Sequence, residues 1–343
     1  PTVIEIYGAH WPRCHKPILP AGSGYIQTLS AAAIQKGVDI RTAVKVTRLE
    51  LEKGRVIGVC AEVDEKICFY RARKGVVIAT GGFGQNRQLV EASDPLLRGL
   101  TSTSAPGATG EVMLAAAQAG VLLRDMQYIQ CLPGCPAGRK HRVRLHNDVA
   151  RFILVDEQGK RFVREDERRD VLCRKVLALP RKYAYSIVDN DGLESYNILI
   201  QKEAWQGIES GDAWKADTLE ELAAKIDVPA EALAASVKAY NQAVESKNDA
   251  FGKSSRELRF KIQTPPFWAC YAGMSVHYTM GGLAINEKAQ CLNAENHPVE
   301  GLWAAGEVTG GVHGANRLGA NGLADAISFG RIAGREAAAS QNN

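Results

Sequence analysis

The sequence contains no apolar run approaching the roughly 18 residues needed to span a bilayer, and it has no recognisable signal peptide. It also has little charge imbalance, because 42 Lys and Arg against 38 Asp and Glu leave a formal net charge of +4 on 343 residues. No nucleic-acid partner is therefore expected. The chain is expected to be soluble, to have no transmembrane segment, and to be large enough for two domains.

Cysteine is also scarce, since eight residues in a chain of 343 are too few for a disulfide scaffold. The motif CLPGC, residues 131–135, lacks the spacing and the following His of a haem or zinc motif. We predict buried, apolar cysteines and no metal site. The densest basic run, RKHRVR at residues 139–144, is predicted to be a solvated face.

The first part of the chain alternates helix and strand. A helix is predicted at about residues 25–36, ended by Gly37, and three antiparallel strands follow within residues 44–73. A short apolar strand at 76–79 then runs into glycines, which is typical of a buried parallel strand whose end faces a ligand. Another helix is predicted at 110–119, with Thr109 as its N-cap.

The middle of the chain has a different pattern, with a hairpin around Gln158 and Gly159, a basic helix, and two amphipathic helices. Pro229 is predicted to open the second of these helices at its first position. The first pattern returns near residue 268 with a short apolar strand and a long helix of small residues. We therefore predict a discontinuous α/β domain, residues 1–128 and 268–343, with an α+β domain, residues 129–267, inserted into it.

Seven motifs follow one another along the chain. They are GSGYIQTL, VVIATGGFGQN, GATGEVM, DMQYIQ, GKRFVREDERRD, VHYTMGG and GEVTGGVHGANRLGAN. In this order they resemble the flavoprotein subunit of the fumarate reductase and succinate dehydrogenase superfamily, and most closely its soluble, flavocytochrome-c-like branch. The resemblance covers nearly the whole chain. It implies an incomplete Rossmann-like FAD-binding domain with a mobile capping domain, and an FAD-dependent oxidoreductase acting on CH–CH groups.

The resemblance also implies residue roles. His277 and Arg317 would hold one carboxylate of an α,β-unsaturated acid, and Thr279 and Asp170 would also lie in the substrate site. An arginine suits this role because its guanidinium binds a carboxylate through two parallel hydrogen bonds, in bidentate geometry. Arg169 would deliver a proton to the substrate carbon, although the neighbouring Arg168 leaves the register open by one residue. FAD would contact Thr80, Gly81, Gly82, Thr109, Gly110, Tyr278, Glu307, Gly322 and Leu323.

Two departures limit the resemblance. The dicarboxylate enzymes of the family have Ala-His-Pro after YIQ, whereas this chain has Cys131, Leu132 and Pro133. Because Leu132 cannot donate a hydrogen bond and an unpaired buried carboxylate is costly, we predict an unsaturated acid whose far end is uncharged. The family's opening GxGxxG turn is also absent, so we expect a fragment that binds FAD poorly alone, or a chain that has lost FAD.

Several alternatives stay open. A flavin dehydrogenase of the ketosteroid or cyclic-ketone type shares the fold, but relies on tyrosine hydroxyls rather than on a carboxylate clamp. A flavin-free, noncatalytic fragment is a second alternative. The electron donor and the compartment, bacterial periplasm or cytoplasm, are not specified, and an oligomer formed through exposed sheet surface is a further expectation.

Overall fold

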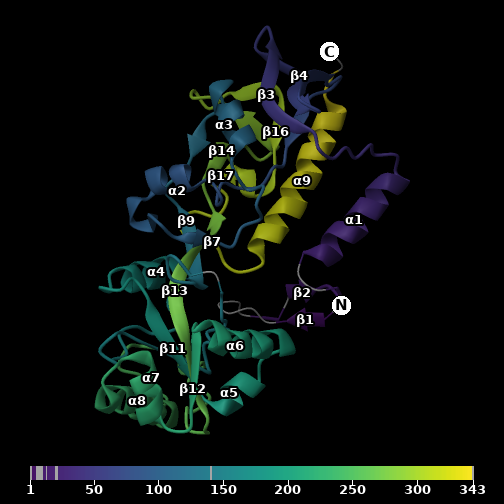
Figure 1. Ribbon diagram of the computed structural model, residues 1–343. Coiled ribbons are helices and arrows are strands. Elements are labelled where there is room, and N and C mark those ends of the chain that lie inside the picture. Colours follow the sequence, from purple (N-terminus) through teal and green to yellow (C-terminus); the bar gives the residue numbers. More distant parts are fainter. Residues whose placement is uncertain (1, 5–10, 13, 20–21, 140, 342–343) are drawn as a thin grey trace. The chain divides into compact units, whose positions relative to one another are not determined.

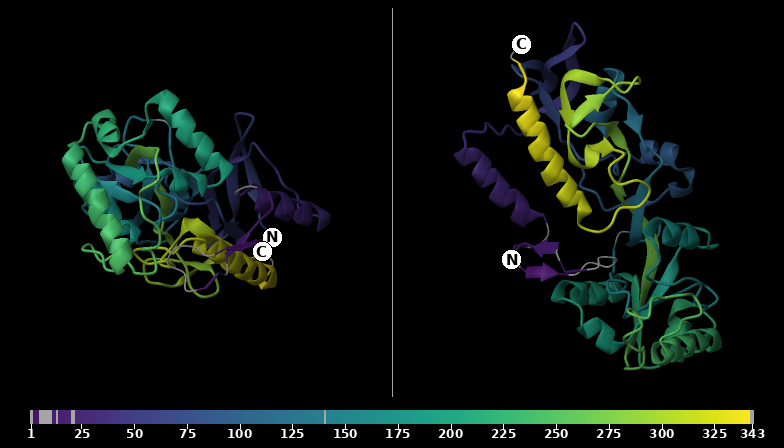
Figure 2. Two further views of the ribbon diagram at one scale, coloured as in Figure 1. Left: turned by 90° about the horizontal axis from the view of Figure 1, so that it is seen from below. Right: turned by 180° about the vertical axis from the view of Figure 1, so that it is seen from behind.

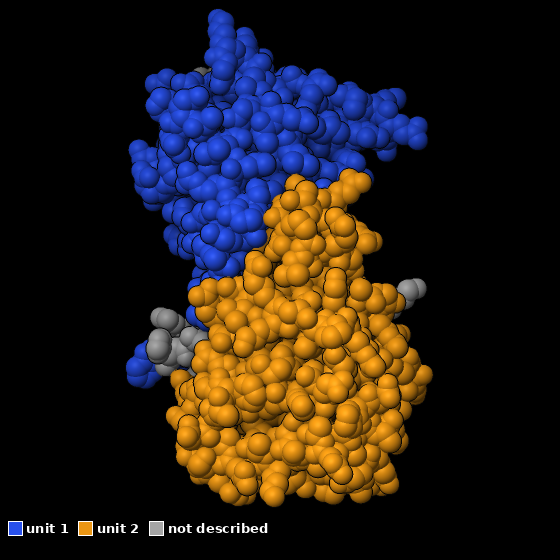
Figure 3. All heavy atoms as spheres, turned by 90° about the vertical axis from the view of Figure 1, so that its left-hand side faces the viewer, with its two compact units in different colours: residues 1–86, 106–128, 279–343 blue, residues 87–105, 129–278 orange. Residues whose placement is uncertain are grey.

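The chain folds into two compact units (Figure 3). Unit 1 consists of residues 1–86, 106–128 and 279–343, and unit 2 of residues 87–105 and 129–278. The computed structural model describes residues 2–4, 11–12, 14–19, 22–139 and 141–341. Within this described part, no helix is both long and apolar enough to cross a membrane.

The division differs from the sequence-based domain bounds in two places, because residues 87–105 and 268–278 belong to unit 2. Strand pairing explains both differences. The short strand β7 (Thr101–Ser102) pairs in parallel with the long strand β13 (Phe267–Thr279), so both segments join the main sheet of unit 2.

Unit 1 contains the predicted antiparallel meander, formed by β3 (Lys45–Glu52), β4 (Arg55–Val63) and β5 (Lys66–Arg71). Alternating residues on β4 bury one of its faces, on which Val56 and Cys60 are at most 4% exposed, and Ala61 on the other face is also buried. This sheet confirms the sequence-based reading of residues 44–73 (Figure 1).

A second sheet of unit 1 has the order β15-β16-β6 and includes the predicted parallel strand. Here β6 (Val76–Ile78) runs parallel to β16 (Pro298–Ala304), while β15 (Gln290–Leu292) is antiparallel to β16. The prediction of a buried parallel strand is confirmed in its parallel pairing and only partly in its burial: β6 lies at the edge of this sheet, where Ile78 is 2% exposed but Val77 is 38% exposed. The parallel pairing brings the chain segments that follow β6 and β16 to one edge of the sheet.

The helices of unit 1 begin and end largely at glycines. Helix α1 (Ser23–Gln35) is followed by Gly37 at φ 78°, as predicted. Helix α3 (Glu111–Gln118) starts from Gly110 at φ 70°, so the prediction of Thr109 as its N-cap is wrong. Glycine takes this left-handed position because a side chain would be strained there.

Helix α9 (Asn321–Ala339) is the long helix of small residues and packs against β16 and the 3-10 turn η2 (Gly306–Val308) (Figure 1). Ala333 on α9 is fully buried with Trp303 of β16. The remaining elements of unit 1 are β1 (Thr2–Ile4), β2 (Cys14–Lys16), β8 (Leu123–Arg124), β14 (Gly282–Ala284) and β17 (Thr309–Gly310).

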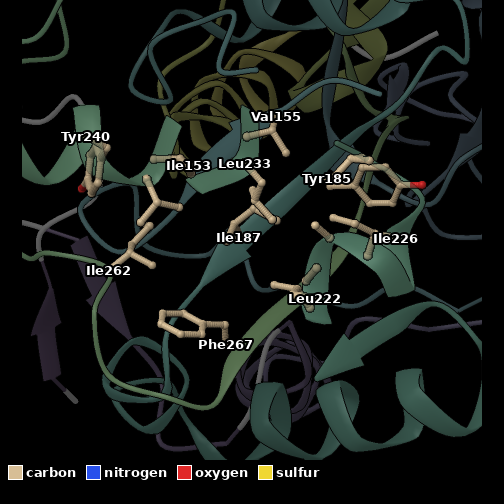
Figure 4. Close-up of a cluster of buried hydrophobic side chains, with 14 of the residues drawn as sticks. Ile153, Val155, Tyr185, Ile187, Leu222, Ile226, Leu233, Tyr240, Ile262 and Phe267 are labelled. Carbon is tan, nitrogen blue, oxygen red and sulfur yellow. The ribbon is translucent and has the colours of Figure 1, made fainter. Parts of the chain in front are cut away.

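Unit 2 is built on a sheet in which β10 (Ile153–Val155), β11 (Ala184–Val188), β13 and β12 (Ala213–Ala216) follow one another, with β7 and β9 (Ile129–Gly134) also paired to β13. Helices α7 (Leu219–Ile226) and α8 (Ala230–Ser246) cover one face and α5 (Asn190–Glu194) and α6 (Ile198–Ser210) the other (Figure 2). The α7 and α8 face encloses the core that includes Ile153, Ile187, Leu222, Leu233 and Tyr240 (Figure 4). On the other face, Trp205 of α6 packs edge-on against Trp268 of β13, with ring centroids 5.0 Å apart.

Local predictions for unit 2 were partly right. The turn at Gln158 and Gly159 forms, but the returning strand of the hairpin is a single bridge between Val155 and Arg161. Pro229 is the N-cap of α8 rather than its first helical residue.

The helices of unit 2 are α2 (Arg87–Ser93), α4 (Arg169–Leu177), α5 (Asn190–Glu194), α6 (Ile198–Ser210), α7 (Leu219–Ile226), α8 (Ala230–Ser246) and the 3-10 turn η1 (Pro95–Leu97). The other strands are β9 (Ile129–Gly134), β10 (Ile153–Val155), β11 (Ala184–Val188) and β12 (Ala213–Ala216).

Candidate functional site

Three predicted residues of unit 1 meet at the edge where β6 and β16 end. Glu307 Oε1 accepts hydrogen bonds from the backbone N of Thr279 at 3.0 Å and from its hydroxyl at 3.4 Å. A Cβ atom on Gly82 would lie 2.1 Å from Thr279 Oγ1 and 2.6 Å from Glu307 Oε1. Only glycine therefore fits beside this pair. Thr279 is fully buried, and its hydroxyl serves Glu307.

The carboxyl group of Glu307 lies in a largely apolar setting. Burial raises its pKa, while the hydrogen bonds from Thr279 and the nearby charge of Arg317 act in the opposite direction. A carboxylate whose pKa is raised by burial is a good acceptor of hydrogen bonds from hydroxyl groups. Arg317 itself is 9% exposed and donates from Nη1 to the Leu318 carbonyl at 3.1 Å.

The loop after β6 is joined to the loop before α3. Gln85 N donates to the Ala108 carbonyl at 2.9 Å, and Asn86 Nδ2 donates to the Thr109 carbonyl at 3.0 Å. These bonds bring the segment of Thr80, Gly81 and Gly82 together with that of Thr109 and Gly110. Gly81 has φ 75°, and no atom lies within 4 Å of the position that its Cβ would take.

The first turn of α9 is partly engaged within the chain, because Asn321 N and Leu323 N donate to the Leu318 and Ala320 carbonyls at 3.3 Å and 3.0 Å. Its N-cap, Ala320, makes no side-chain cap hydrogen bond, and Leu323 in the first turn is 47% exposed. A helix N-terminus favours negative charge, such as that on a polarised carbonyl oxygen. Together with the open backbone at Gly81 and the acceptor Glu307, this arrangement fits the resemblance-based assignment of Gly322 and Leu323 to FAD.

A histidine and aspartate pair, which sequence reasoning missed, fixes the loop before α9. His313 Nε2 lies 3.2 Å from Asp325 Oδ2, with side chains 10% and 3% exposed. His313 stands four residues before Arg317, and Asp325 is the fifth residue of α9. The pair therefore links the arginine-bearing loop to the helix. His313 lies within the motif GEVTGGVHGANRLGAN, but Asp325 lies outside it, and the pairing of the two has no local sequence signal.

In unit 2, β13 carries His277. Its Nδ1 lies 2.7 Å from the hydroxyl of Thr103, which directly follows β7. The next residue, Tyr278, is only 8% exposed. Thr103 was missed because it precedes the GATG motif without belonging to a recognisable pattern itself.

Helix α4 begins at Arg169, the predicted proton donor. Its neighbour Arg168 is engaged by Asp170 through two hydrogen bonds, of 3.1 Å to Oδ1 and 2.7 Å to Oδ2. Asp170, which was predicted as the neighbour of Arg169, thus accepts these hydrogen bonds from Arg168. Arg168 is exposed, whereas Arg169 is half-buried.

Behind Arg169 lies a histidine, His146, that sequence reasoning also missed. Its Nε2 donates to the Pro133 carbonyl at 3.1 Å, and its Nδ1 is buried without a hydrogen-bond partner in the described part of the chain. Burial, together with the charges of Arg142 and Arg169, lowers its pKa to about 3. His146 is therefore neutral at physiological pH.

The basic run at residues 139–144 was predicted to be a solvated face. This prediction is corrected by the structure, in which arginines of the run form ion pairs and hydrogen bonds with other parts of unit 2. Arg139 pairs with Asp212 at 3.0 Å, and Arg144 makes a forked pair with Glu203. Arg142 donates to the Pro133 carbonyl at 3.1 Å. Val143 between them is buried, which pulls the flanking arginines against the unit. Lys140 lies outside the described residues.

The cysteines conform to expectation, as all eight are free and six are buried. Cys131 on β9 and Cys173 on α4 share a hydrogen bond, which, with burial, raises the pKa of Cys131 well above its usual value. The described residues contain no group of three or more His, Cys, Asp or Glu side chains that could hold a metal ion.

The parallel strand ends, the glycine turns and the start of α9 define a flavin-binding α/β protein that carries a second unit. The chain belongs to the FAD binding domain family, whose model matches residues 7–323. This match confirms the predicted fold class and superfamily, and it indicates FAD as the cofactor.

Relatives with named activities extend over most of the chain. It is 38% identical to a fumarate reductase (cytochrome) of Shewanella frigidimarina over 96% of this chain and 57% of that protein. It is 36% identical to an NADH:acrylate oxidoreductase of Vibrio harveyi over 98% of this chain and 34% of that protein. A urocanate reductase of Eggerthella lenta is 35% identical over 78% of this chain and 45% of that protein. The chain thus spans about a third to just over half the length of these relatives.

Solved structures agree with this assignment. The open conformation of a flavocytochrome c3 fumarate reductase matches with a TM-score of 0.76 at 33% identity, covering 98% of this chain and 59% of that one. A 3-ketosteroid Δ1-dehydrogenase from Sterolibacterium denitrificans matches with a TM-score of 0.75 at 26% identity, covering 91% of this chain and 62% of that one.

Proposed function

We propose that the protein is an FAD-dependent reductase of the C=C bond of an α,β-unsaturated carboxylate. The observation that carries the proposal is the retention of His277 and Arg317 in a chain whose named relatives reduce fumarate, acrylate and urocanate. FAD, when bound and reduced, supplies a hydride to the substrate's β carbon. The electron donor that reduces it is left open.

In this proposal, Arg317 and His277 grip the single carboxylate. Arg317 is held by its own loop through the bond to Leu318, and the loop is fixed to α9 by the His313 and Asp325 pair. A preorganised guanidinium stabilises the charge that develops on the carboxylate side as the double bond is reduced. The two residues therefore orient the substrate and polarise its double bond.

Arg169 is proposed to supply the proton for the α carbon. Arginine alone is a poor acid because its pKa exceeds 12, so Arg169 would act as one link of a relay and stabilise the enolate by its charge. The half-buried position of Arg169 at the start of α4, beside the exposed Arg168, supports Arg169 rather than Arg168 in this role. Asp170 would then act on the substrate site only through Arg168.

The substrate's far end is proposed to be uncharged. Leu132 lies on β9, which pairs with β13, the strand of His277. A second carboxylate beside a leucine would lose its hydration without gaining a hydrogen bond. Acrylate-type and cinnamate-type acids meet this requirement, whereas fumarate does not.

A flavin dehydrogenase acting on a cyclic ketone is the second candidate, favoured by the likeness to the 3-ketosteroid dehydrogenase structure. A neutral ketone does not need a guanidinium partner, whereas a carboxylate is matched by one. Retention of Arg317 therefore favours the carboxylate.

Substitution of Arg317 tests the proposal. In FAD-loaded protein, Arg317→Ala should lower kcat/KM for an unsaturated monocarboxylate by about 100-fold, since a charge-assisted pair is lost, and Arg317→Lys should lower it less. Arg335→Ala, which removes a 73% exposed arginine from the same unit, should leave it unchanged. Flavin absorbance would verify equal FAD content. Full turnover by Arg317→Ala would refute the assignment.

A further inference from the structure

We infer that Thr103 is a positioning residue that presents the Nε2–H of His277 to the substrate carboxylate. The inference rests on the proposed function, because it assumes that His277 binds this carboxylate. The contact behind it lies wholly within unit 2, where Thr103 Oγ1 is 2.7 Å from His277 Nδ1.

The backbone holds Thr103 at this place. Ser275 and Val276 of β13 pair with Thr101 and Ser102 of β7, and the register continues as the backbone N of Thr103 donates to the Val276 carbonyl at 2.8 Å. Thr103 is thus fixed by the same strand that carries His277. Its hydroxyl has a defined position relative to the imidazole, with no dependence on a long, flexible side chain.

The hydroxyl can serve both protonation states of the ring. With neutral His277, the hydroxyl is expected to donate to Nδ1 at 2.7 Å rather than to the more distant Val276 carbonyl at 3.3 Å, which leaves the ring proton on Nε2. With the imidazolium, Nδ1–H donates to the hydroxyl, whose hydrogen can turn to the Val276 carbonyl. In both of these arrangements Nε2 carries a hydrogen, which is the group that a carboxylate requires. A hydroxyl that donates to the neutral ring and accepts from the charged ring therefore keeps Nε2 protonated.

A neighbouring pair provides a matched control. Thr101 Oγ1 lies 2.9 Å from the hydroxyl of Ser275, which stands two residues before His277 on β13. Thr101 lies in β7 and Thr103 directly follows it, and the described partner of the Thr101 hydroxyl is a serine, which does not titrate. Removal of its hydroxyl alters the packing of the same two strands without altering the imidazole.

Ring nitrogen shifts of His277 provide the readout, measured by ¹⁵N NMR on the FAD-loaded protein. The wild-type ring, when neutral, should carry its proton on Nε2. Thr103→Val should produce a mixture of the two neutral tautomers, whereas Thr103→Ser and Thr101→Val should retain the wild-type pattern. A neutral wild-type ring protonated on Nδ1, or an unchanged pattern in Thr103→Val, would overturn the inference.

Kinetics with acrylate and cinnamate complete the test. Thr103→Val should lower kcat/KM by about 10-fold or more at unchanged FAD content, Thr103→Ser should recover most of this loss, and Thr101→Val should behave like wild type. If Thr103→Val does not fold, the wild-type tautomer and the behaviour of Thr103→Ser still decide the matter. His277→Gln separates the two claims: full turnover by this variant would refute the proposed function, whereas a Thr103→Val variant equal to wild type would refute only the role of Thr103.

Discussion

At the scale of single residues, the roles of the charged groups follow from their surroundings more than from their identity. Arg168 and Arg169 are adjacent and chemically equal, yet only one is engaged by Asp170. Glu307 has its pKa raised by burial, while Glu165, although more deeply buried, has its pKa lowered because Lys253 and Arg161 outweigh the effect of burial. Sequence motifs identify such residues but contain no information about these neighbours.

His146 should make the stability of unit 2 depend on pH. Its pKa of about 3 in the folded state lies below the ordinary value near 6.5, so only the unfolded chain takes up this proton as the pH falls between these values. Stability should therefore decrease with falling pH in this window, by up to about 1.4 kcal/mol per pH unit from this group.

The His146→Gln variant, which cannot titrate, tests this expectation. Its free energy of unfolding should fall less steeply than that of wild type between about pH 6.5 and about pH 4. Denaturant unfolding followed by the tryptophans of unit 2 would measure the two slopes. Equal slopes would show that His146 is not protected from protonation in the folded state.

At the scale of elements, the turn after β6 depends on a close approach that only glycine permits. A methyl group at Gly82 would overlap Thr279 Oγ1 and displace Glu307. Gly82→Ala should therefore lower FAD content and destabilise unit 1 by about 1–3 kcal/mol. Gly107→Ala, whose Cβ would have no atom within 4 Å, should do neither. Flavin absorbance and thermal unfolding would measure both; similar losses in the two variants would contradict the account.

A buried ion network ties the turn before α4 to the segment after α8. Lys253 Nζ lies 2.9 Å from Glu165 Oε2, with both side chains fully buried, and Arg161 joins Glu165 to Asp249. The two cations and two carboxylates balance each other. Loss of one carboxylate leaves a buried cation without its full compensation.

Glu165→Gln should accordingly destabilise unit 2 by about 3–5 kcal/mol. Glu245→Gln removes the partner of Lys261 in an exposed pair, at 62% exposure for the carboxylate, and should cost about 0.2–1 kcal/mol. Denaturant unfolding of both variants would provide the comparison. A small effect of Glu165→Gln would mean that water reaches the network.

The elements that sequence reasoning predicted well are those with a strong local pattern, such as the β3-β4-β5 meander and the small-residue helix α9. It failed where tertiary contacts decide. Gly110 rather than Thr109 starts α3 because the chain there adopts a left-handed conformation. The basic run is held in place because partners distant in sequence, Asp212 and Glu203, reach it. The proposed role of Thr103 likewise depends on its pairing with β13, a contact between segments distant in sequence.

At the scale of the whole molecule, each unit contributes a different part of the proposed chemistry. Unit 1 contains Arg317 and the predicted FAD contacts other than Tyr278, whereas unit 2 contains His277, Arg169 and Leu132. The sequence predicted two parts but not their bounds, since β7 and most of β13 join unit 2 by strand pairing that has no local signal. The proposed activity therefore requires both units.

The most direct test of this account is the rate at which its reduced flavin is reoxidised by different unsaturated acids. FAD-loaded protein, reduced chemically without oxygen, would be mixed with acrylate, cinnamate or fumarate, and the return of the flavin absorbance followed by stopped flow. This measurement needs no knowledge of the natural electron donor. The account predicts rapid reoxidation by at least one of the two monocarboxylates and slow reoxidation by fumarate. Faster reoxidation by fumarate, or none by any of the acids, would contradict it.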